Sequence, residues 1–277
     1  MRNFNKTIQL FIFDGDPNGR IMCELSNWNG RVYKVSRNQL SEFSKRDDCT
    51  YTGVYFLFGK DENNNETIYI GEAENIITRL KQHIGDTVYW NECVVVISKD
   101  NVLNKAHVKY LENKFYLLAK EANRAIIVNS TVPTCSSVSE YDQAMLEEFI
   151  DNAKLLVNTL GYKALEVVTI EETEITKFYI KATRGADAVG AIVSDGFIVF
   201  KGSVVASSTT PSIAESLNSF RKKLYENKTI DETHRFTRDY IFTSPSYAAG
   251  VVLGRNANGK TEWKTDEHKT INDIESI

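Results

Sequence analysis

The chain of 277 residues lacks long apolar runs and closely spaced cysteines. Its apolar stretches, such as residues 8–13 and 94–97, fall far short of the about 20 residues that a membrane-spanning helix needs. Its four cysteines are scattered and include no CxxC pair, which argues against a structural zinc site and a disulfide framework. We therefore expect reduced thiols, a cytoplasmic location and no membrane partner.

The chain also lacks a net positive charge. Its 33 Lys and Arg are outnumbered by 37 Asp and Glu, which gives a net charge of −4. The acidity is concentrated, because residues 136–177 contain 3 basic and 9 acidic side chains, whereas residues 178–265 contain 12 basic and 8 acidic ones. This distribution argues against nonspecific coating of DNA but is compatible with a local basic groove.

What the chain does have is the composition of an ordinary soluble globular protein, with 42% hydrophobic and 25% charged residues. Its length is sufficient for two domains. Apolar periodicity and turn signals divide it into five segments. They are a β-rich N-terminal extension (1–50), an α/β domain (51–135), an acidic connecting helix and linker (136–177), a C-terminal α+β domain (178–265) and a polar tail (266–277).

The pattern over residues 51–135 predicts a β-hairpin followed by two helices. Two strand-like runs, 52–58 and 67–71, flank a loop without any apolar side chain. Apolar spacing then predicts helices over 74–84 and 105–123, with a buried strand between them. A further helix is predicted over 139–160, beyond a capping pair at its start.

The hairpin and the first helix contain a group of residues that suits chemistry. Tyr55 ends the tripeptide Gly-Val-Tyr on the first strand, and Tyr69 begins Tyr-Ile-Gly on the second. On paired strands the two tyrosines can share one face. Arg79 and His83 are four residues apart, so they lie on one side of the helix.

The second helix adds Glu112, which falls among its apolar positions. A carboxylate there is costly unless it is paired or binds a metal ion. It could form an ion pair with Lys105 or Lys109, or bind a hard divalent cation, which needs few protein carboxylates besides water and substrate phosphate. Asn129 follows after a short apolar run.

In this order, these residues resemble the GIY-YIG nuclease family over residues 51–130, under a third of the chain. The resemblance implies an α/β (α+β) module with a small three-stranded sheet flanked by helices. It also implies hydrolysis of DNA phosphodiester bonds at one metal ion, Mg²⁺ or Mn²⁺. Its implied site residues are the two family tyrosines, the helix arginine and a nearby histidine, the metal ligand, and a late asparagine: Tyr55, Tyr69, Arg79, His83, Glu112 and Asn129.

The residue types suit that chemistry. Glu112 would hold the cation, and Arg79 would pair with phosphate oxygens through its forked donors. Tyr55 would position or deprotonate water, and a neighbouring positive charge would have to lower its pKa for deprotonation. Tyr69 and His83 would orient groups or relay protons. The spacer between the tyrosines is long for the family, and Tyr89 is a further candidate after the arginine helix.

The C-terminal segment resembles a domain of undefined role that is often attached to GIY-YIG modules. The pieces that resemble it are residues 200–203, 242–249, and 258–259 leading to 263–264. Its basic excess suggests DNA contacts. The candidate residues for such contacts are Lys201, Arg221, Lys222, Lys223 and Arg255, although a hairpin turn and a solvated helix face would produce the same pattern.

Three functions are compatible with the sequence. The leading one is a metal-dependent DNA endonuclease, for which a homodimer is one arrangement that could cut both strands. The second is a catalytically silent nucleic-acid-binding or regulatory protein that uses the GIY-YIG module as a scaffold. The third is a protein-interaction module that docks through the acidic helix over 139–160.

Overall fold

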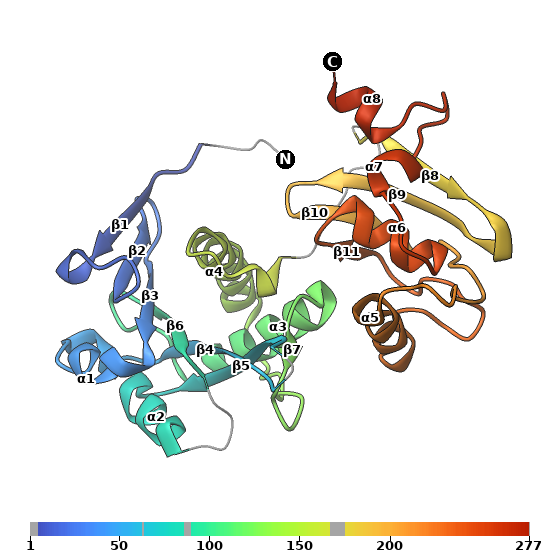
Figure 1. The fold of residues 1–277 in the computed structure, drawn as a ribbon. Helices are drawn as coiled ribbons and strands as arrows, with labels where there is room; N and C mark the ends of the chain where they lie inside the picture. Colours follow the sequence, from blue (N-terminus) through green and yellow to red (C-terminus); the bar gives the residue numbers. More distant parts are fainter. Residues whose placement is uncertain (1–4, 63, 86–89, 167–174, 277) are drawn as a thin grey trace. The chain divides into compact units, whose positions relative to one another are not determined.

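The structure is a computed structural model, and it describes residues 5–62, 64–85, 90–166 and 175–276. The chain forms two compact units, Met1–Val168 and Thr169–Ile277 (Figure 1). Each unit combines one sheet with helices, so the expected mixed α/β (α+β) class is confirmed. No helix within the described ranges is both long and apolar enough to cross a bilayer.

In the first unit, seven strands form one sheet with the order β1-β2-β3-β6-β4-β5-β7. Neighbouring strands are antiparallel except for the parallel pair β5 and β7. The strands are β1 (Ile8–Ile12), β2 (Ile21–Leu25), β3 (Gly30–Ser36), β4 (Gly53–Lys60), β5 (Glu66–Ala73), β6 (Glu92–Ser98) and β7 (Ile126–Ile127). The helices are α1 (Leu40–Phe43), α2 (Ile76–Gln82), α3 (Lys105–Ala122) and α4 (Glu140–Thr159).

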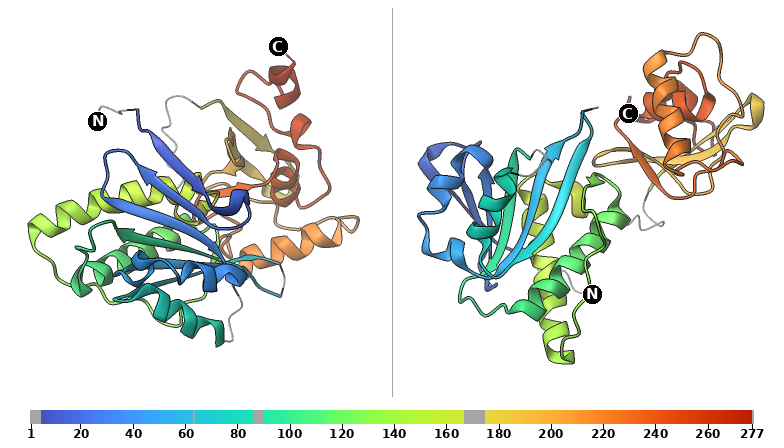
Figure 2. Two further views of the ribbon diagram at one scale, coloured as in Figure 1. Left: turned by 90° about the vertical axis from the view of Figure 1, so that its left-hand side faces the viewer. Right: turned by 90° about the horizontal axis from the view of Figure 1, so that it is seen from below.

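Helices cover both faces of this sheet, with α1 and α2 on one side and α3 and α4 on the other (Figure 2). Strand β4 shows why its sequence is almost wholly apolar. Val54 and Phe56 pack in the cluster that includes α3 and α4, whereas Tyr55 and Leu57 pack in the cluster that includes α1 and α2. Because alternate side chains point to opposite faces, a strand covered on both sides is apolar throughout.

The expected three-stranded sheet is larger in the structure. The N-terminal segment expected as an extension supplies β1, β2 and β3, and β3 pairs with β6 from Gly30–Ser98 to Ser36–Glu92. The strands β4, β5 and β6 thus form the middle of a wider sheet. Pairing between β3 and β6 joins residues far apart in the chain, so local periodicity does not reveal it.

The acidic helix expected as a connection between domains is α4, capped by Ser139, whose Oγ accepts from the Asp142 backbone N–H at 3.1 Å. It belongs instead to the core of the first unit. Its buried side chains include Phe149, Leu156 and Val157, which pack in the cluster that contains α3 and one face of the sheet. Its acidic residues lie on the opposite, solvated side, as in an ordinary amphipathic helix.

The second unit has a four-stranded antiparallel sheet with the order β11-β10-β9-β8 and four α-helices in its described residues. The strands are β8 (Lys177–Lys181), β9 (Asp187–Val193), β10 (Gly196–Val199) and β11 (Tyr240–Phe242). The helices are α5 (Glu215–Glu226), α6 (Pro245–Leu253), α7 (Gly259–Glu262) and α8 (Ile271–Glu275). Ile271 is buried in the core of this unit, so the segment expected as a polar tail is largely folded.

Arg221 on α5 is buried, with 4% of its surface exposed. Its guanidinium donates hydrogen bonds to the backbone carbonyls of Ala206 and Val251 and lies 3.4 Å from the Tyr225 hydroxyl. Burial lowers the Arg221 pKa, and the nearby Arg184 also lowers it. Arg221 therefore connects backbone segments inside the unit, which corrects the expectation that it contacts DNA.

Replacing Arg221 should destabilise the second unit. Arg221→Met leaves the Ala206 and Val251 carbonyls without this donor, and a buried unsatisfied acceptor costs about 1–3 kcal/mol. We expect the free energy of unfolding to fall by about 2–4 kcal/mol in urea titrations followed by circular dichroism. The matched control Lys222→Met changes an exposed neighbour and should have an effect below about 0.5 kcal/mol. Equal losses in the two variants would contradict the assigned role.

Candidate active site

A cleft of about 410 Å³ opens in the first unit between the hairpin β4–β5, helix α2 and the first turns of α3. It lies at the end of β5 away from β7, which pairs with β5 only at Thr67 and Ile68. The side chains that line it are mostly polar, and four of them are sequence-predicted site residues. The lining residues are Tyr55, Tyr69, Glu72, Ala73, Glu74, Asn75, Thr78, Arg79, Gln82, Lys105 and Glu112.

The two tyrosines lie next to each other on the side of the hairpin that faces α2. Their rings stack, with centroids 6.2 Å apart. The strand register places Tyr55 opposite Gly71, and a Cβ atom on Gly71 would lie 2.3 Å from the Tyr55 hydroxyl. Only a residue without a side chain therefore allows the Tyr55 ring to cross β5.

Helix α2 brings Arg79 and His83 to the tyrosines. Asn75 caps the helix by accepting a hydrogen bond from the Thr78 backbone N–H at 3.0 Å. One turn after Arg79, the chain places His83 beneath the tyrosines, with its Nε2 atom 2.7 Å from the Tyr55 hydroxyl and 4% of its surface exposed. His83 thus supports the cleft from behind, while Arg79 lies on its wall.

The two tyrosines stabilise the charged form of Arg79. Burial alone would lower its pKa, but hydrogen bonding and charge interactions with Tyr55 and Tyr69 raise the pKa above its ordinary value. The same guanidinium donates a hydrogen bond to Gln82 Oε1 at 2.9 Å. Arg79 is therefore a fixed cation whose forked donors face the cleft.

Tyr55 is not suited to deprotonate water. Burial raises its pKa above the ordinary value, and the nearby Tyr69 raises it further, whereas Arg79 only partly lowers it. The side chain is fully buried apart from the edge that reaches the cleft. Tyr55 consequently remains a neutral phenol at neutral pH, and of its two expected roles only the positioning of water fits.

Glu112 faces this cleft from α3 and makes no direct hydrogen bond or ion pair with the other described residues. The charges of Lys105, Lys109 and Arg79 still favour its ionised form, so the expected interaction with the two lysines is present only as a longer-range attraction. Burial raises its pKa to about 7, and the charge of Glu72 contributes to that rise. Such a carboxylate gains stability from any cation that enters the cleft.

Two carboxylates that line the cleft, those of Glu72 and Glu112, fit a divalent cation of the Mg²⁺ type. Burial is the main cause of the raised pKa of Glu112, and repulsion by the charge of Glu72 adds to it. In the described part of the chain no three acidic, histidine or cysteine side chains gather around one point. A cation here would therefore keep several water or phosphate ligands, as Mg²⁺ commonly does.

Glu72 was not anticipated from the sequence, and Lys105 was considered only as an ion-pair partner of Glu112 and not as a lining residue of the cleft. Lys105 is the first residue of α3, and its Nζ atom lies 2.8 Å from Glu72 Oε1 and 3.7 Å from Glu74 Oε2. One signal could have indicated Lys105. It precedes Glu112 by two helical turns, and residues at that spacing share one face of a helix.

Asn129 does not line the cleft but fixes one of its edges. Its side-chain Oδ1 accepts a hydrogen bond from the Ile70 backbone N–H at 3.0 Å, and its Nδ2 donates to the Ile70 carbonyl at 2.7 Å. The Asn129 side-chain amide thus forms with Ile70 the pair of hydrogen bonds that a neighbouring strand would form. It extends the pairing of β7 with β5 up to the residue next to Tyr69. Tyr89, the further candidate, lies outside the described residues.

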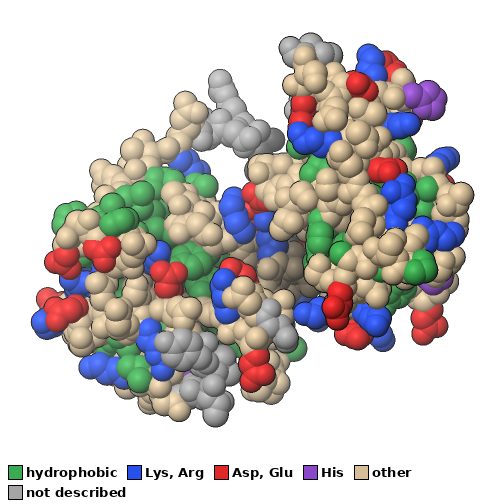
Figure 3. Space-filling model, viewed as in Figure 1, with side chains coloured by type: hydrophobic (Ala, Val, Ile, Leu, Met, Phe, Trp, Pro, Cys, Tyr) green, Lys and Arg blue, Asp and Glu red, His purple; other side chains and the backbone are tan. Residues whose placement is uncertain are grey.

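The expected DNA-contacting residues of the second unit differ in their surroundings. Lys201, Lys222 and Lys223 are exposed, whereas Arg255 is half-buried and its guanidinium lies 2.7 Å from Glu262 Oε1. On the face that Figure 3 shows, basic and acidic side chains are interspersed rather than gathered into one broad basic surface. Any contact with DNA would therefore depend on local groups of residues.

Residues 178–275 match the model of a family described as a domain of unknown function, DUF4357. The match covers the described part of the second unit and includes α8, beyond the boundary expected at residue 265. No curated protein and no solved structure matches the chain. The resemblance of residues 51–130 to GIY-YIG nucleases therefore depends on the motif residues alone.

The contact between Tyr55 and Gly71 should appear as a coupling energy. Gly71→Ala forces the Tyr55 ring away from β5, and we expect it to lower the free energy of unfolding by about 1–3 kcal/mol, as overpacking does. In a Tyr55→Ala background the same change should cost far less, which a double-mutant cycle in urea measures. The control Gly85→Ala meets open space and should be near neutral. Additive losses from Gly71→Ala and Tyr55→Ala would disprove the contact.

Proposed function

We propose that the first unit is a metal-dependent endonuclease that hydrolyses DNA phosphodiester bonds at a single-metal site of the GIY-YIG type. The observation that carries the proposal is the gathering of four predicted site residues around one cleft: Tyr55, Tyr69, Arg79 and the half-buried Glu112. DNA is preferred as the substrate because the resemblance to the nuclease family implies it.

Arg79 supplies the positive charge that a phosphodiester requires. Its guanidinium can donate two parallel hydrogen bonds to phosphate oxygens, where negative charge increases in the transition state. Its position is set before substrate arrives, because Tyr55, Tyr69 and Gln82 hold it. The site therefore needs little rearrangement to stabilise that charge.

Tyr55 and Tyr69 position the attacking water. Both phenols reach the cleft, and the raised pKa of Tyr55 keeps its proton in place, so the hydroxyl can orient water through hydrogen bonds. His83 holds the Tyr55 hydroxyl from the buried side at 2.7 Å. His83 is thus a positioning residue that acts through Tyr55.

Glu112 on α3 would hold the cation, and Glu72 on β5 lines the same cleft. When bound, Mg²⁺ or Mn²⁺ supplies Lewis-acid polarisation of the phosphate and stabilises the leaving oxygen. Lys105 partly balances the acidic wall through its ion pair with Glu72. This balance allows a polyanionic substrate to approach two carboxylates.

Loss of the Glu112 carboxylate should abolish cutting. Glu112→Gln preserves the shape of the side chain but removes the charge, and we expect metal-dependent cleavage of supercoiled plasmid to fall by roughly 10³-fold. The assay compares Mg²⁺, Mn²⁺ and EDTA on plasmid, single-stranded DNA and structured RNA. Glu121→Gln, an exposed glutamate on the same helix, should cut like the wild type.

Two other outcomes of this cleavage assay would contradict the proposed nuclease site. If no substrate is cut by the wild type in either metal while DNA binding persists in EDTA, the first unit is a binding scaffold. If cutting survives in Glu112→Gln at the level of Glu121→Gln, the assigned metal ligand is wrong.

The charge of Lys105 should tune metal affinity. Lys105→Met removes the cation that lies 2.8 Å from Glu72 Oε1. An ion pair that water screens contributes about 1 kcal/mol, so Mn²⁺ should bind about fivefold more tightly. Isothermal titration measures this without substrate. Lys120→Met, an exposed lysine near the other end of α3, serves as the control. Unchanged or weaker Mn²⁺ binding in Lys105→Met would show that the charge of Lys105 does not oppose metal binding.

A further inference from the structure

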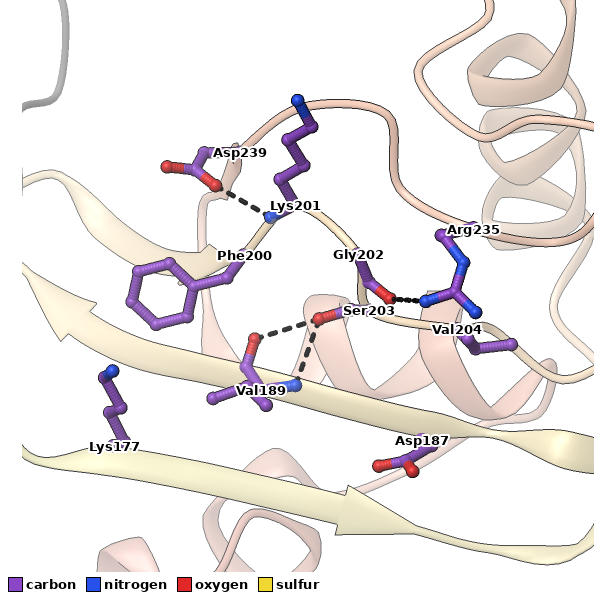
Figure 4. Close-up of a pocket in the computed structure, with 10 residues that line it drawn as sticks. All are labelled: Lys177, Asp187, Val189, Phe200, Lys201, Gly202, Ser203, Val204, Arg235 and Asp239. Atoms are coloured by element: carbon purple, nitrogen blue, oxygen red, sulfur yellow. Dashed lines mark hydrogen bonds between the residues drawn. The ribbon is translucent and has the colours of Figure 1, made fainter.

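The second unit contains a pocket of about 630 Å³ beside the loop that follows β10 (Figure 4). It combines one aromatic ring with three cations and two carboxylates, a composition different from the core around it. The lining residues are Lys177, Asp187, Val189, Phe200, Lys201, Gly202, Ser203, Val204, Arg235 and Asp239.

The loop at this pocket is rigidly held. The Lys201 backbone N–H donates to Asp239 Oδ1 at 2.7 Å, and Arg235 donates to the Gly202 carbonyl at 2.5 Å. The Ser203 hydroxyl accepts a hydrogen bond from the Val189 N–H at 3.0 Å and donates to the Val189 carbonyl at 3.2 Å. Side chains on a loop fixed in this way lose little conformational freedom when they bind a ligand.

Phe200 lies in this pocket and not in the core of the unit. The preceding residues of β10, 197–199, are fully buried, whereas Phe200 is only partly buried and does not belong to the core cluster. The ammonium group of Lys177 lies 5.8 Å from the centre of its ring. A partly exposed aromatic ring beside cations is the arrangement that proteins use to stack a nucleic-acid base.

The cations lie around the ring on more than one side. In Figure 4, Phe200 and Lys177 are on one side of the pocket, Arg235 is on the other, and Lys201 extends away from its floor. The carboxylates that line the pocket each have a nearby donor or cation: Asp239 accepts from the Lys201 backbone N–H, and the exposed Asp187 lies 3.9 Å from Lys181. Phosphates on both sides of a stacked base would therefore meet Lys201 and Arg235.

We propose that this pocket binds single-stranded DNA, with one base stacked on Phe200 and the flanking phosphates on Lys201 and Arg235. Duplex DNA does not fit the same description, because its bases are already stacked on one another and offer no free ring face. The choice of DNA as the ligand rests on the proposed nuclease function. On that function, the second unit would bind an unpaired stretch of the DNA substrate.

The test measures binding by the full chain that contains Glu112→Gln, in EDTA, so that no cutting occurs. The anisotropy of a fluorescein-labelled single-stranded oligonucleotide gives the affinity, and a duplex of the same sequence is measured in parallel. Phe200→Leu keeps an apolar side chain but removes the ring. It should weaken single-strand binding about 5- to 100-fold and leave duplex binding unchanged, whereas Tyr141→Leu, at a tyrosine 90% exposed, should leave both unchanged.

Salt dependence tests the phosphate contact. Lys201→Gln should reduce the slope of log affinity against log salt by about 0.7 for the single strand, and Lys120→Gln, at the exposed lysine on α3, should not. The proposal is overturned if Phe200→Leu binds within twofold of its parent, or if single-strand and duplex binding weaken equally. Wild-type protein that binds through Phe200 but cuts no DNA in Mg²⁺ or Mn²⁺ would remove the nuclease assignment and leave the pocket assignment standing.

Discussion

The Tyr55 ring passes over the backbone of Gly71 on the neighbouring strand, and the other groups of the candidate site are arranged around this contact. It needs the exact pairing of β4 with β5, because a shift by one residue would turn Tyr55 to the opposite face of the sheet. With that register, the hydroxyl reaches His83, and the rings of both tyrosines border Arg79. The sheet thus fixes the geometry of the cleft before any ligand binds.

The surroundings of the cleft stabilise the charge of Arg79 but not that of Glu112. Tyr55 and Tyr69 favour the charged form of Arg79. Glu112 is half-buried and is repelled by Glu72, and the more distant charges of Lys105, Lys109 and Arg79 compensate only in part. A buried charge without a partner costs stability, and a ligand that binds only the folded state restores it in proportion to its affinity and concentration. On the proposed function, a cation would therefore stabilise Glu112, whereas Arg79 already has its charged form stabilised by the two tyrosines before it meets phosphate.

Local patterns predicted the hairpin, α2, α3 and the residues that they carry, because strand alternation and helical periodicity depend on near neighbours. They missed the pairing of β3 with β6, which joins distant residues, and they missed Glu72, since only the fold brings it to Glu112. Arg221 shows a different failure. It follows Leu217 at helical spacing and so falls on the apolar stripe of α5, but a count of adjacent basic residues grouped it with its exposed neighbours.

On the proposed function, the two units would divide the electrostatic problem that polyanionic DNA presents to a chain of net charge −4. Glu72 and Glu112 repel phosphate at the proposed site of hydrolysis, so the first unit cannot rely on a strongly positive cleft for affinity. Residues 178–265 have 12 basic against 8 acidic side chains, and the pocket at Phe200 adds stacking, which depends little on net charge. If the second unit supplies the affinity for DNA, the cleft needs no additional basic side chains near Glu72 and Glu112. Such side chains would compete with the metal ion for the two carboxylates.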